Sequence, residues 1–382
     1  ARDAWQASLQ SSKRDRPPPR SPIWDKSFRC VINSKNASNN AYAVVLGPIS
    51  EERKYSKWVY PILALKAALH KRGSRADVLA LLALEEDKEK HRMLPNEEAM
   101  LRKAGVRYRY VPKPRIRGFH MVRDSASFPN LRRRRRRDAA PPRRRRRGRY
   151  RVYFVTPSFT QGHYKLWAWQ HTEYRRIQVL DADVLPLVNM DALFELPIES
   201  KFVGCPGKDS VLNAGWFSLR PDCETFKRMT DLLWYRGMRR PRQWDMAKGW
   251  GVPMPAWTNA LGRRMETGWD FFDARGNQGH MYAYFRFFAR DLVLFYPSEV
   301  IRYTPTKEAV VATIGDGSAI SEEVWAAFPC PFFEKKAPPP LAYYHFTGNK
   351  KPWSKYDPSN SKFAEWYAAL GEAGVDPESL FK

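Results

Sequence analysis

Two carboxylates separated by one alanine stand where an apolar segment ends. Residues 178–189 read QVLDADVLPLVN, so Asp181 and Asp183 follow a run that is typical of a buried strand. Unpaired charge is expensive at such a place, and a divalent cation bound by both side chains would remove that cost. Residues i and i+2 of a strand point the same way, so the two side chains would project together if the strand continues through them. An Asp-x-Asp triplet is also common in turns and helix caps, so the alternative that the two aspartates are turn or cap residues stays open.

A second segment, far along the chain, carries residues suited to the same chemistry. Residues 345–353, HFTGNKKPW, follow an apolar stretch. His345 offers a neutral imidazole as a third ligand, Gly348 permits close approach of the backbone, and Lys351 can meet a phosphate. The alternative for His345 is a buried histidine with its hydrogen bonds satisfied.

A third segment, 212–219, reads LNAGWFSL and starts a predicted strand. Asn213 and the small Ala-Gly pair that ends at Gly215 would let a polar ligand lie against the backbone. Asn213 is also a common turn former, and that interpretation stays open.

The elements that must position these segments follow an α/β rhythm. Predicted strands alternate with predicted helices, which end in glycines and carry a proline near their starts. The strands are 41–46, 76–84 and 106–111, and the helices are 57–73 and 95–105. This order predicts an open, mainly parallel sheet with helices on both faces, in which ligands bind at the carboxyl ends of the strands.

The remaining elements complete one predicted domain. Helices are expected at 164–174, 221–237 and 360–374, and strands at 175–183, 211–219, 292–297 and 341–348. Residues 1–40 read as a polar extension, 41–371 as the domain, about 113–160 as an Arg/Pro-rich disordered insert, and 372–382 as a tail. The segment 237–276 is expected to form long loops.

The net charge of +26 favours anionic partners, and eleven of those charges lie in two arginine runs, 132–137 and 143–147, which leaves +15. The runs suggest a polyanion or nucleic-acid binder as an alternative function. They lack interleaved aromatic residues for base stacking, so nucleic acid is not expected as the main partner.

The four cysteines form no CxxC pair, which argues against a zinc site, and a single disulfide stays open.

Three blocks, in this order, resemble the glycogenin-like retaining glycosyltransferases (glycosyltransferase family 8). They are KLWAWQHTEYRRIQVLDADVLPLVNMDALFELP, LNAGWFSLRPD and HFTGNKKPW, at 165–197, 212–222 and 345–353. Residues 41–69 are similar to the family's opening strand and helix, and the resemblance runs from about 41 to 355 with the arginine-rich insert between. It implies a single GT-A type, Rossmann-like domain that transfers a hexose or related sugar.

The resemblance also implies ligands and roles. Manganese, or magnesium in its place, would be held by Asp181, Asp183 and His345, and a UDP-sugar would be the donor. Lys165 would face the donor, Tyr55 the uracil and Asp181 the ribose, whereas Gly348 and Lys351 would contact the diphosphate. The implied donor-binding residues are Tyr55, Lys165, Asp181, Asn213, Gly215, Gly348 and Lys351.

Two departures from the family pattern matter for mechanism. The family's usual acid-Gln pair falls at Asn277 and Gln278, and an asparagine cannot act as a carboxylate nucleophile. This disfavours a covalent intermediate and favours same-face attack, with Gln278 near the anomeric carbon. Gly47 and Pro48 replace a Thr-Asn pair near the uridine, which puts uridine recognition there, including the Tyr55 assignment, in question.

The acceptor is expected to be a carbohydrate or a glycoprotein, and its identity is not readable. Trp167 and Trp169 are predicted core residues; the loop tryptophans Trp244, Trp250, Trp257 and Trp269 are candidates for stacking on an acceptor. A protein that binds sugar nucleotides with weakened catalysis is a further alternative.

The cytoplasm and the Golgi lumen are both compartments that fit the sequence. A membrane is expected as a partner only if an anchor precedes this chain, which begins without a methionine.

Overall fold

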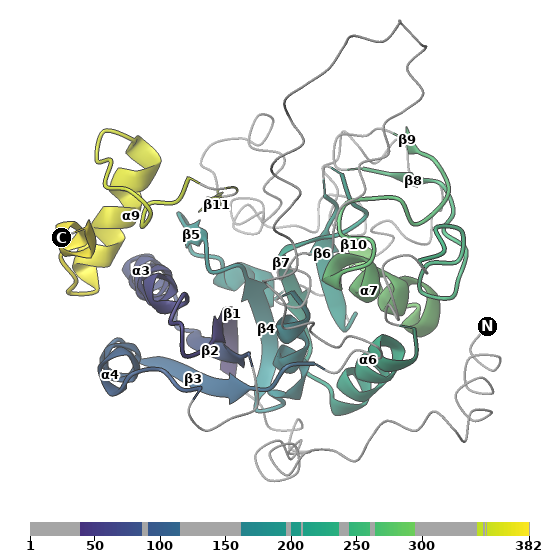
Figure 1. Ribbon diagram of the computed structural model, residues 1–382, viewed down its shortest axis with the longest axis horizontal. Helices are drawn as coiled ribbons and strands as arrows, with labels where there is room; N and C mark the ends of the chain where they lie inside the picture. Colours follow the sequence, from purple (N-terminus) through teal and green to yellow (C-terminus); the bar gives the residue numbers. More distant parts are fainter. Residues whose placement is uncertain are drawn as a thin grey trace, which may run out of the picture.

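The structure is a computed structural model of the 382-residue chain, and its central element is a twisted sheet (Figure 1). It describes residues 39–85, 91–114, 162–195, 200–207, 209–236, 244–259, 264–294, 342–346, 348 and 350–381. The extension 1–38 and most of the arginine-rich insert lie outside these residues. Their predicted character, and the domain boundaries with them, stay predictions.

Seven strands form the central sheet, in the order β10-β6-β7-β4-β1-β2-β3. The neighbours β3, β2, β1 and β4 run parallel, β10 runs parallel to β6, and β7 is antiparallel to both β4 and β6. The predicted α/β class with a mixed, mainly parallel sheet is confirmed. The strands are β1 (Asn39–Ile49), β2 (Asp77–Leu84), β3 (Val106–Val111), β4 (Tyr174–Leu180), β6 (Phe202–Cys205), β7 (Asn213–Leu219) and β10 (Val293–Leu294).

Helices cover both faces of the sheet, and two apolar clusters fill the space between. Alternate residues of β2 enter different clusters: Val78 and Leu82 pack with α3, α4 and α9, whereas Leu79 and Leu81 pack with η4, α6 and α7. A strand buried on both sides explains the continuous apolar run at 78–84. The helices are α3 (Val59–Lys71), α4 (Pro95–Lys103), η4 (Tyr164–Gln170), α6 (Cys223–Arg236), α7 (Asn277–Ala283) and α9 (Ser361–Glu372).

Proline and glycine set the helix ends as predicted. Pro61 lies in the first turn of α3, and Pro95 is the first residue of α4. Gly73 and Gly105 follow these helices with φ of 77° and 69°, in the left-handed region that glycine favours.

Two predicted elements differ from the structure, and two helical segments were not predicted. The expected helix 164–174 is the shorter 3₁₀ helix η4, in which Trp167 and Trp169 are buried, as predicted for core residues. β4 ends at Leu180, before the two aspartates, so the strand prediction through residue 183 was wrong. The helix α7 and the π-helical turn after it, at Tyr284–Ala289, were not predicted.

Short elements join the sheet to the carboxyl-terminal part. β5 (Val184–Pro186) pairs with β11 (Tyr343–His345) in a separate two-stranded sheet, and α9 packs against α3. The segment 244–276 is largely irregular apart from the two-residue strands β8 (Trp257–Thr258) and β9 (Arg264–Met265). Within the described ranges, no helix is both long and apolar enough to cross a bilayer.

Candidate metal and donor site

A turn and a short ladder bring the two aspartates and the histidine together. Beyond the end of β4, the N–H of Asp181 donates to Gly215 O (2.9 Å) and the N–H of Val184 donates to Asp181 O (3.1 Å). The β5–β11 ladder then places His345 opposite Val184, and the N–H of Phe346 donates to Asp183 O (2.9 Å). A turn, rather than a continuing strand, therefore makes the carboxylates converge.

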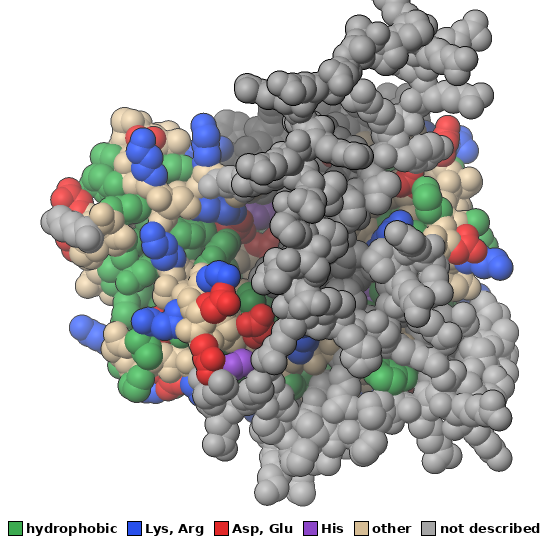
Figure 2. Space-filling view, viewed as in Figure 1, with side chains coloured by type: hydrophobic (Ala, Val, Ile, Leu, Met, Phe, Trp, Pro, Cys, Tyr) green, Lys and Arg blue, Asp and Glu red, His purple; other side chains and the backbone are tan. Residues whose placement is uncertain are grey.

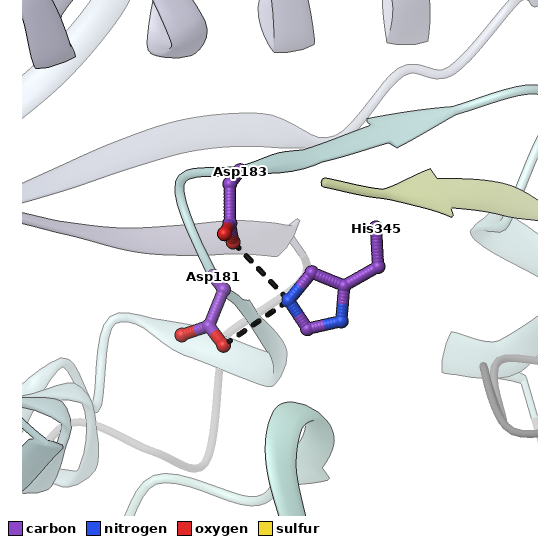
Figure 3. A group of neighbouring side chains, drawn as sticks. All are labelled: Asp181, Asp183 and His345. Carbon is purple, nitrogen blue, oxygen red and sulfur yellow. Dashed lines mark ion pairs between the residues drawn. The ribbon is translucent and has the colours of Figure 1, made fainter. Parts of the chain in front are cut away.

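The three side chains form a compact ligand set (Figure 3). Nε2 of His345 lies 3.2 Å from Oδ1 of Asp183 and 3.6 Å from Oδ2 of Asp181. One ligand atom from each residue lies within 4.8 Å of the others. Two carboxylate oxygens and one imidazole nitrogen fit a divalent cation, and within the described ranges no other such group of three occurs. The predicted ligand set is thus brought together in space.

Each aspartate uses its other oxygen to bind a lysine. Lys165 Nζ lies 2.5 Å from Oδ1 of Asp181 and also donates to Ala214 O (2.5 Å). Lys351 Nζ donates to Oδ2 of Asp183 and to the carbonyl oxygen of Phe346. The lysines balance the charge of the two partly buried carboxylates and leave the other carboxylate oxygens facing His345.

Hydrogen bonding couples the protonation of Asp183 and His345. Burial raises the pKa of Asp183, but the hydrogen bond and charge of His345 and the charge of Lys351 outweigh burial and lower this pKa to about 2. Burial lowers the pKa of His345, whereas its hydrogen bond to Asp183 and that residue's charge raise it, for a net increase. A cation that binds Nε2 must displace a proton there, so cation binding is expected to weaken as the pH falls.

Gly215 leaves room for the site. Its N–H donates to Oδ1 of Asn213 (2.6 Å). A Cβ atom at this position would lie 2.8 Å from Cε1 of His345 and 3.3 Å from Oδ2 of Asp181. Both residues of the predicted donor segment therefore lie beside the metal ligands.

Two tryptophans flank Lys351, a feature that the sequence reasoning missed. Its Nζ lies 5.7 Å from the ring centroid of Trp58 and 5.9 Å from that of Trp353, and the two rings meet edge to face at 5.0 Å. Both distances fall within the range of cation–π attraction. The arrangement is expected to hold the ammonium group at the edge of the site.

Two predicted donor residues have no contact with the cluster among the described interactions. Tyr55 is 2% exposed and donates its hydroxyl hydrogen to Oε2 of Glu97 (2.9 Å). Gly348 has φ of 81°, with open space where a Cβ would stand. Their roles toward a donor stay predictions.

The predicted catalytic pair begins α7. Oε1 of Gln278 accepts a hydrogen bond from Ser210 Oγ (3.0 Å), and the Asn277 side chain packs against Gly162. Asp273, which the sequence reasoning also missed, accepts the N–H of Gln278 through Oδ2 (3.0 Å). Burial raises the pKa of Asp273 to about 6. The sequence shows an acid four residues before Asn277 but gives no sign that the chain turns back on it.

The loop tryptophans mostly serve the core. Trp250, Trp257 and Trp269 are 0%, 6% and 1% exposed and lie in one apolar cluster, and Trp244 is partly buried against it. These tryptophans therefore serve in packing, and their rings do not form open platforms for an acceptor.

A cavity of about 640 Å³ lies at the opposite, amino end of the parallel strands. Asp191 lines it, but its carboxylate already accepts hydrogen bonds from Tyr42, Ser74 and the N–H of Arg75. None of the predicted site residues lines this cavity. The chemistry points instead to the carboxyl ends of β4 and its neighbours, where ligands of parallel sheets bind.

Comparison with known proteins gives only distant similarity. No protein-family model and no curated protein matches the sequence. Among solved structures, the chain is similar to the glycosyltransferase GlyE of Streptococcus pneumoniae TIGR4 (11% identity, 90% of this chain, 62% of that chain, TM-score 0.40). It is also similar to the galactosyltransferase LgtC in complex with donor and acceptor sugar analogues (14%, 89%, 98%, 0.39) and to mouse xyloside xylosyltransferase 1 (10%, 67%, 85%, 0.32). The chain spans less than two thirds of GlyE, and at these values the similarity assigns no activity.

Proposed function

We propose that this protein is a GT-A type, glycogenin-like glycosyltransferase that moves a hexose or related sugar from a UDP-sugar to a carbohydrate or glycoprotein acceptor. The observation that carries the proposal is the convergence of Asp181, Asp183 and His345 between two lysines. A divalent cation and two ammonium groups at one sheet edge suit the departure of a nucleotide diphosphate.

The charge balance of the site favours a diphosphate ligand. Asp181 and Asp183 are matched by Lys165 and Lys351, so the site is close to neutral while His345 is uncharged. A bound divalent cation would supply two positive charges and Lewis-acid stabilisation of the departing UDP. The mixed oxygen and nitrogen ligand set suits manganese, with magnesium as the alternative.

The chain's own residues then have separable tasks. We propose that Lys351 contacts the diphosphate once a cation engages Asp183, and that Asn213 and Gly215 line the sugar. Asn277 cannot act as a nucleophile, so we propose retention of configuration by same-face attack. Gln278, held by Ser210, would lie near the anomeric carbon.

We propose that the protein works in an oxidising compartment such as the Golgi lumen, with the cytoplasm as the alternative. Cys205 and Cys223 are both disulfide-bonded. Disulfides persist in secretory compartments and are rare in the cytosol. Peptide mapping of the natural protein without reductant tests this, and free thiols at both positions would contradict it.

The decisive experiment is a screen of UDP-sugars for manganese-dependent UDP release, with and without oligosaccharide acceptors. We expect release with one donor, and a loss of at least a hundredfold in Asp181→Asn and Asp183→Asn, because each variant removes a ligand charge. Circular dichroism and thermal unfolding would confirm that both variants fold.

Two outcomes would contradict the proposal in different ways. Full turnover in either variant would show that the metal site is assigned wrongly. Binding of UDP by calorimetry, without transfer or hydrolysis of any donor, would favour the alternative of a sugar-nucleotide binder with weakened catalysis.

A further inference from the structure

One aromatic ring on the loop before α7 faces solvent. Phe272 is 57% exposed, and only Leu94 and Met246, each 38% exposed, are comparable among the large hydrophobic side chains that the structure describes. A single exposed ring is ordinary in a folded protein, so its meaning depends on how it is held and on what surrounds it.

Hydrogen bonds fix the loop that carries this ring. The N–H of Phe272 donates to Asp209 O (2.7 Å), and the N–H of Gly276 donates to Asp273 O (2.9 Å). Asp273 has φ of 59°, and its carboxylate accepts the N–H of Gln278. A Cβ at position 276 would collide with the Asp273 carboxylate, so the loop is built around this acid. A loop whose backbone is held in this way loses little conformational entropy when a ligand binds.

A further hydrogen bond and one charge link this loop to residues of the proposed donor site. Ser210, the neighbour of the residue that anchors the ring, donates to Oε1 of Gln278 (3.0 Å). The positive charge of Lys165, which binds Asp181, also acts on the Asp273 carboxylate. The exposed ring therefore lies on a segment shared with the residues assigned to the sugar end of the donor.

Charged residues lie close to Phe272 in the sequence. Asp270 is exposed, Asp273 and Arg275 are partly exposed, and the Arg275 guanidinium lies 5.7 Å from the ring centroid of Trp244. A flat apolar ring suits the C–H face of a pyranose, since the face of an aromatic ring carries partial negative charge. Carboxylates and a guanidinium suit its hydroxyl groups. An apolar peptide or a lipid would need a wider apolar surface than this one ring.

We propose that Phe272 is the platform on which a pyranose ring of the acceptor stacks, beside the sugar end of the donor site. The proposal rests on the proposed function for the identity of the neighbouring donor site. It replaces the buried tryptophans as the aromatic contact for the acceptor.

Carbohydrate binding tests the platform independently of turnover. The full-length protein and the variants Phe272→Ala, Phe272→Trp and Leu94→Ala would be applied to a glycan array, and saturation-transfer NMR would follow with the disaccharides maltose, lactose and cellobiose. We expect the wild-type protein to bind at least one glycan, and Phe272→Ala to weaken that binding by on the order of tenfold. Phe272→Trp retains a ring and should bind within threefold of wild type. Leu94→Ala removes a distant exposed side chain and should bind as wild type does.

Activity adds a second readout. In Phe272→Ala we expect transfer to the acceptor to fall more than hydrolysis of the donor by water, because the KM for the acceptor rises. Absence of glycan binding by the wild-type protein, or equal binding by Phe272→Ala, would overturn the platform even if UDP release occurs. Glycan binding that is lost in Phe272→Ala, without UDP release from any donor, would refute the proposed function and leave the platform as a carbohydrate-binding site.

Discussion

At the residue scale, the site depends on the absence of one side chain. A methyl group at position 215 would meet Cε1 of His345 at 2.8 Å and Oδ1 of Asn213 at 2.9 Å. Contacts of this length force the neighbours to move, and a displaced imidazole no longer shares a cation with Asp181 and Asp183.

We expect Gly215→Ala to lower manganese affinity by at least tenfold, measured by electron paramagnetic resonance, and to destabilise the fold by about 1–3 kcal/mol. Gly371→Ala is the matched control, because Gly371 lies in α9 with no atom within 4 Å of the added methyl. Manganese affinity in Gly215→Ala equal to that of the control would show that the ligands do not need this space.

The buried acid Asp273 gives a prediction about pH. Its folded-state pKa of about 6 is above the ordinary value of 3.8, because burial disfavours the charged form. Its contribution to stability is therefore fully present below pH 3.8 and is lost as the pH rises through 6.

Asp273→Asn should remove this pH-dependent loss of stability. Asparagine can still accept the hydrogen bond from the N–H of Gln278, and it is a residue type that tolerates φ of 59°. We expect a gain of about 1–2 kcal/mol in the free energy of unfolding at pH 7.5, where the charged carboxylate carries the cost of burial. At pH 4 the gain should be much smaller. Thermal unfolding at both values measures it, and an equal gain at both would exclude the charge as its source.

The ligands could be predicted from the sequence because their residue types carry the chemistry. Asp181, Asp183 and His345 are oxygen and nitrogen ligands at the ends of apolar runs, and the structure brings them together. Trp58 and Asp273 could not be predicted, because their importance comes from contacts with Lys351 and Gln278 that only the folded chain makes.

At the element scale, strand pairing explains what could not be predicted about the site. The apolar runs that became β4, β5 and β11 were visible, but β5 and β11 are only three residues long, and nothing in such short runs specifies their antiparallel register. That register places His345 opposite Val184 and hence beside Asp183. The long β1–α3–β2–α4–β3 alternation was predictable, since each element is long enough to show its period.

The contact between η3 (Ser56–Trp58) and the segment after β11 gives a prediction at this scale. Trp58 and Trp353 flank Lys351, so Trp58→Leu removes one of two rings that attract its ammonium group. We expect Trp58→Leu to weaken UDP binding in the presence of manganese by roughly two- to tenfold, as one cation–π contact would give. Trp58→Phe keeps a ring and should lose less. Equal losses in the two variants, measured by calorimetry, would assign Trp58 to packing alone.

At the scale of the whole molecule, two features of the chain suit different binding partners. The site at the carboxyl edge of the sheet suits a nucleotide diphosphate, whereas the arginine runs suit any polyanion. On the face shown in Figure 2, the lysine and arginine side chains of the described part are scattered among acidic and apolar ones and form no single basic patch. We expect strong polyanion binding to depend on the runs at 132–137 and 143–147, which concentrate eleven positive charges.

Replacing residues 130–149 with a neutral Gly/Ser linker of equal length tests this separation. The replacement lowers the net charge from +26 to +15 and leaves every residue of the proposed site in place. Phosphate-type contacts give affinities that fall steeply with salt, so we expect wild-type binding to heparin to be salt-dependent and the variant to elute at lower salt. Manganese-dependent UDP release should stay within twofold of wild type, because the lysines at the site, not the runs, meet the diphosphate. A variant that loses sugar transfer along with heparin binding would show that the insert is part of the catalytic unit and that the two functions are not separable.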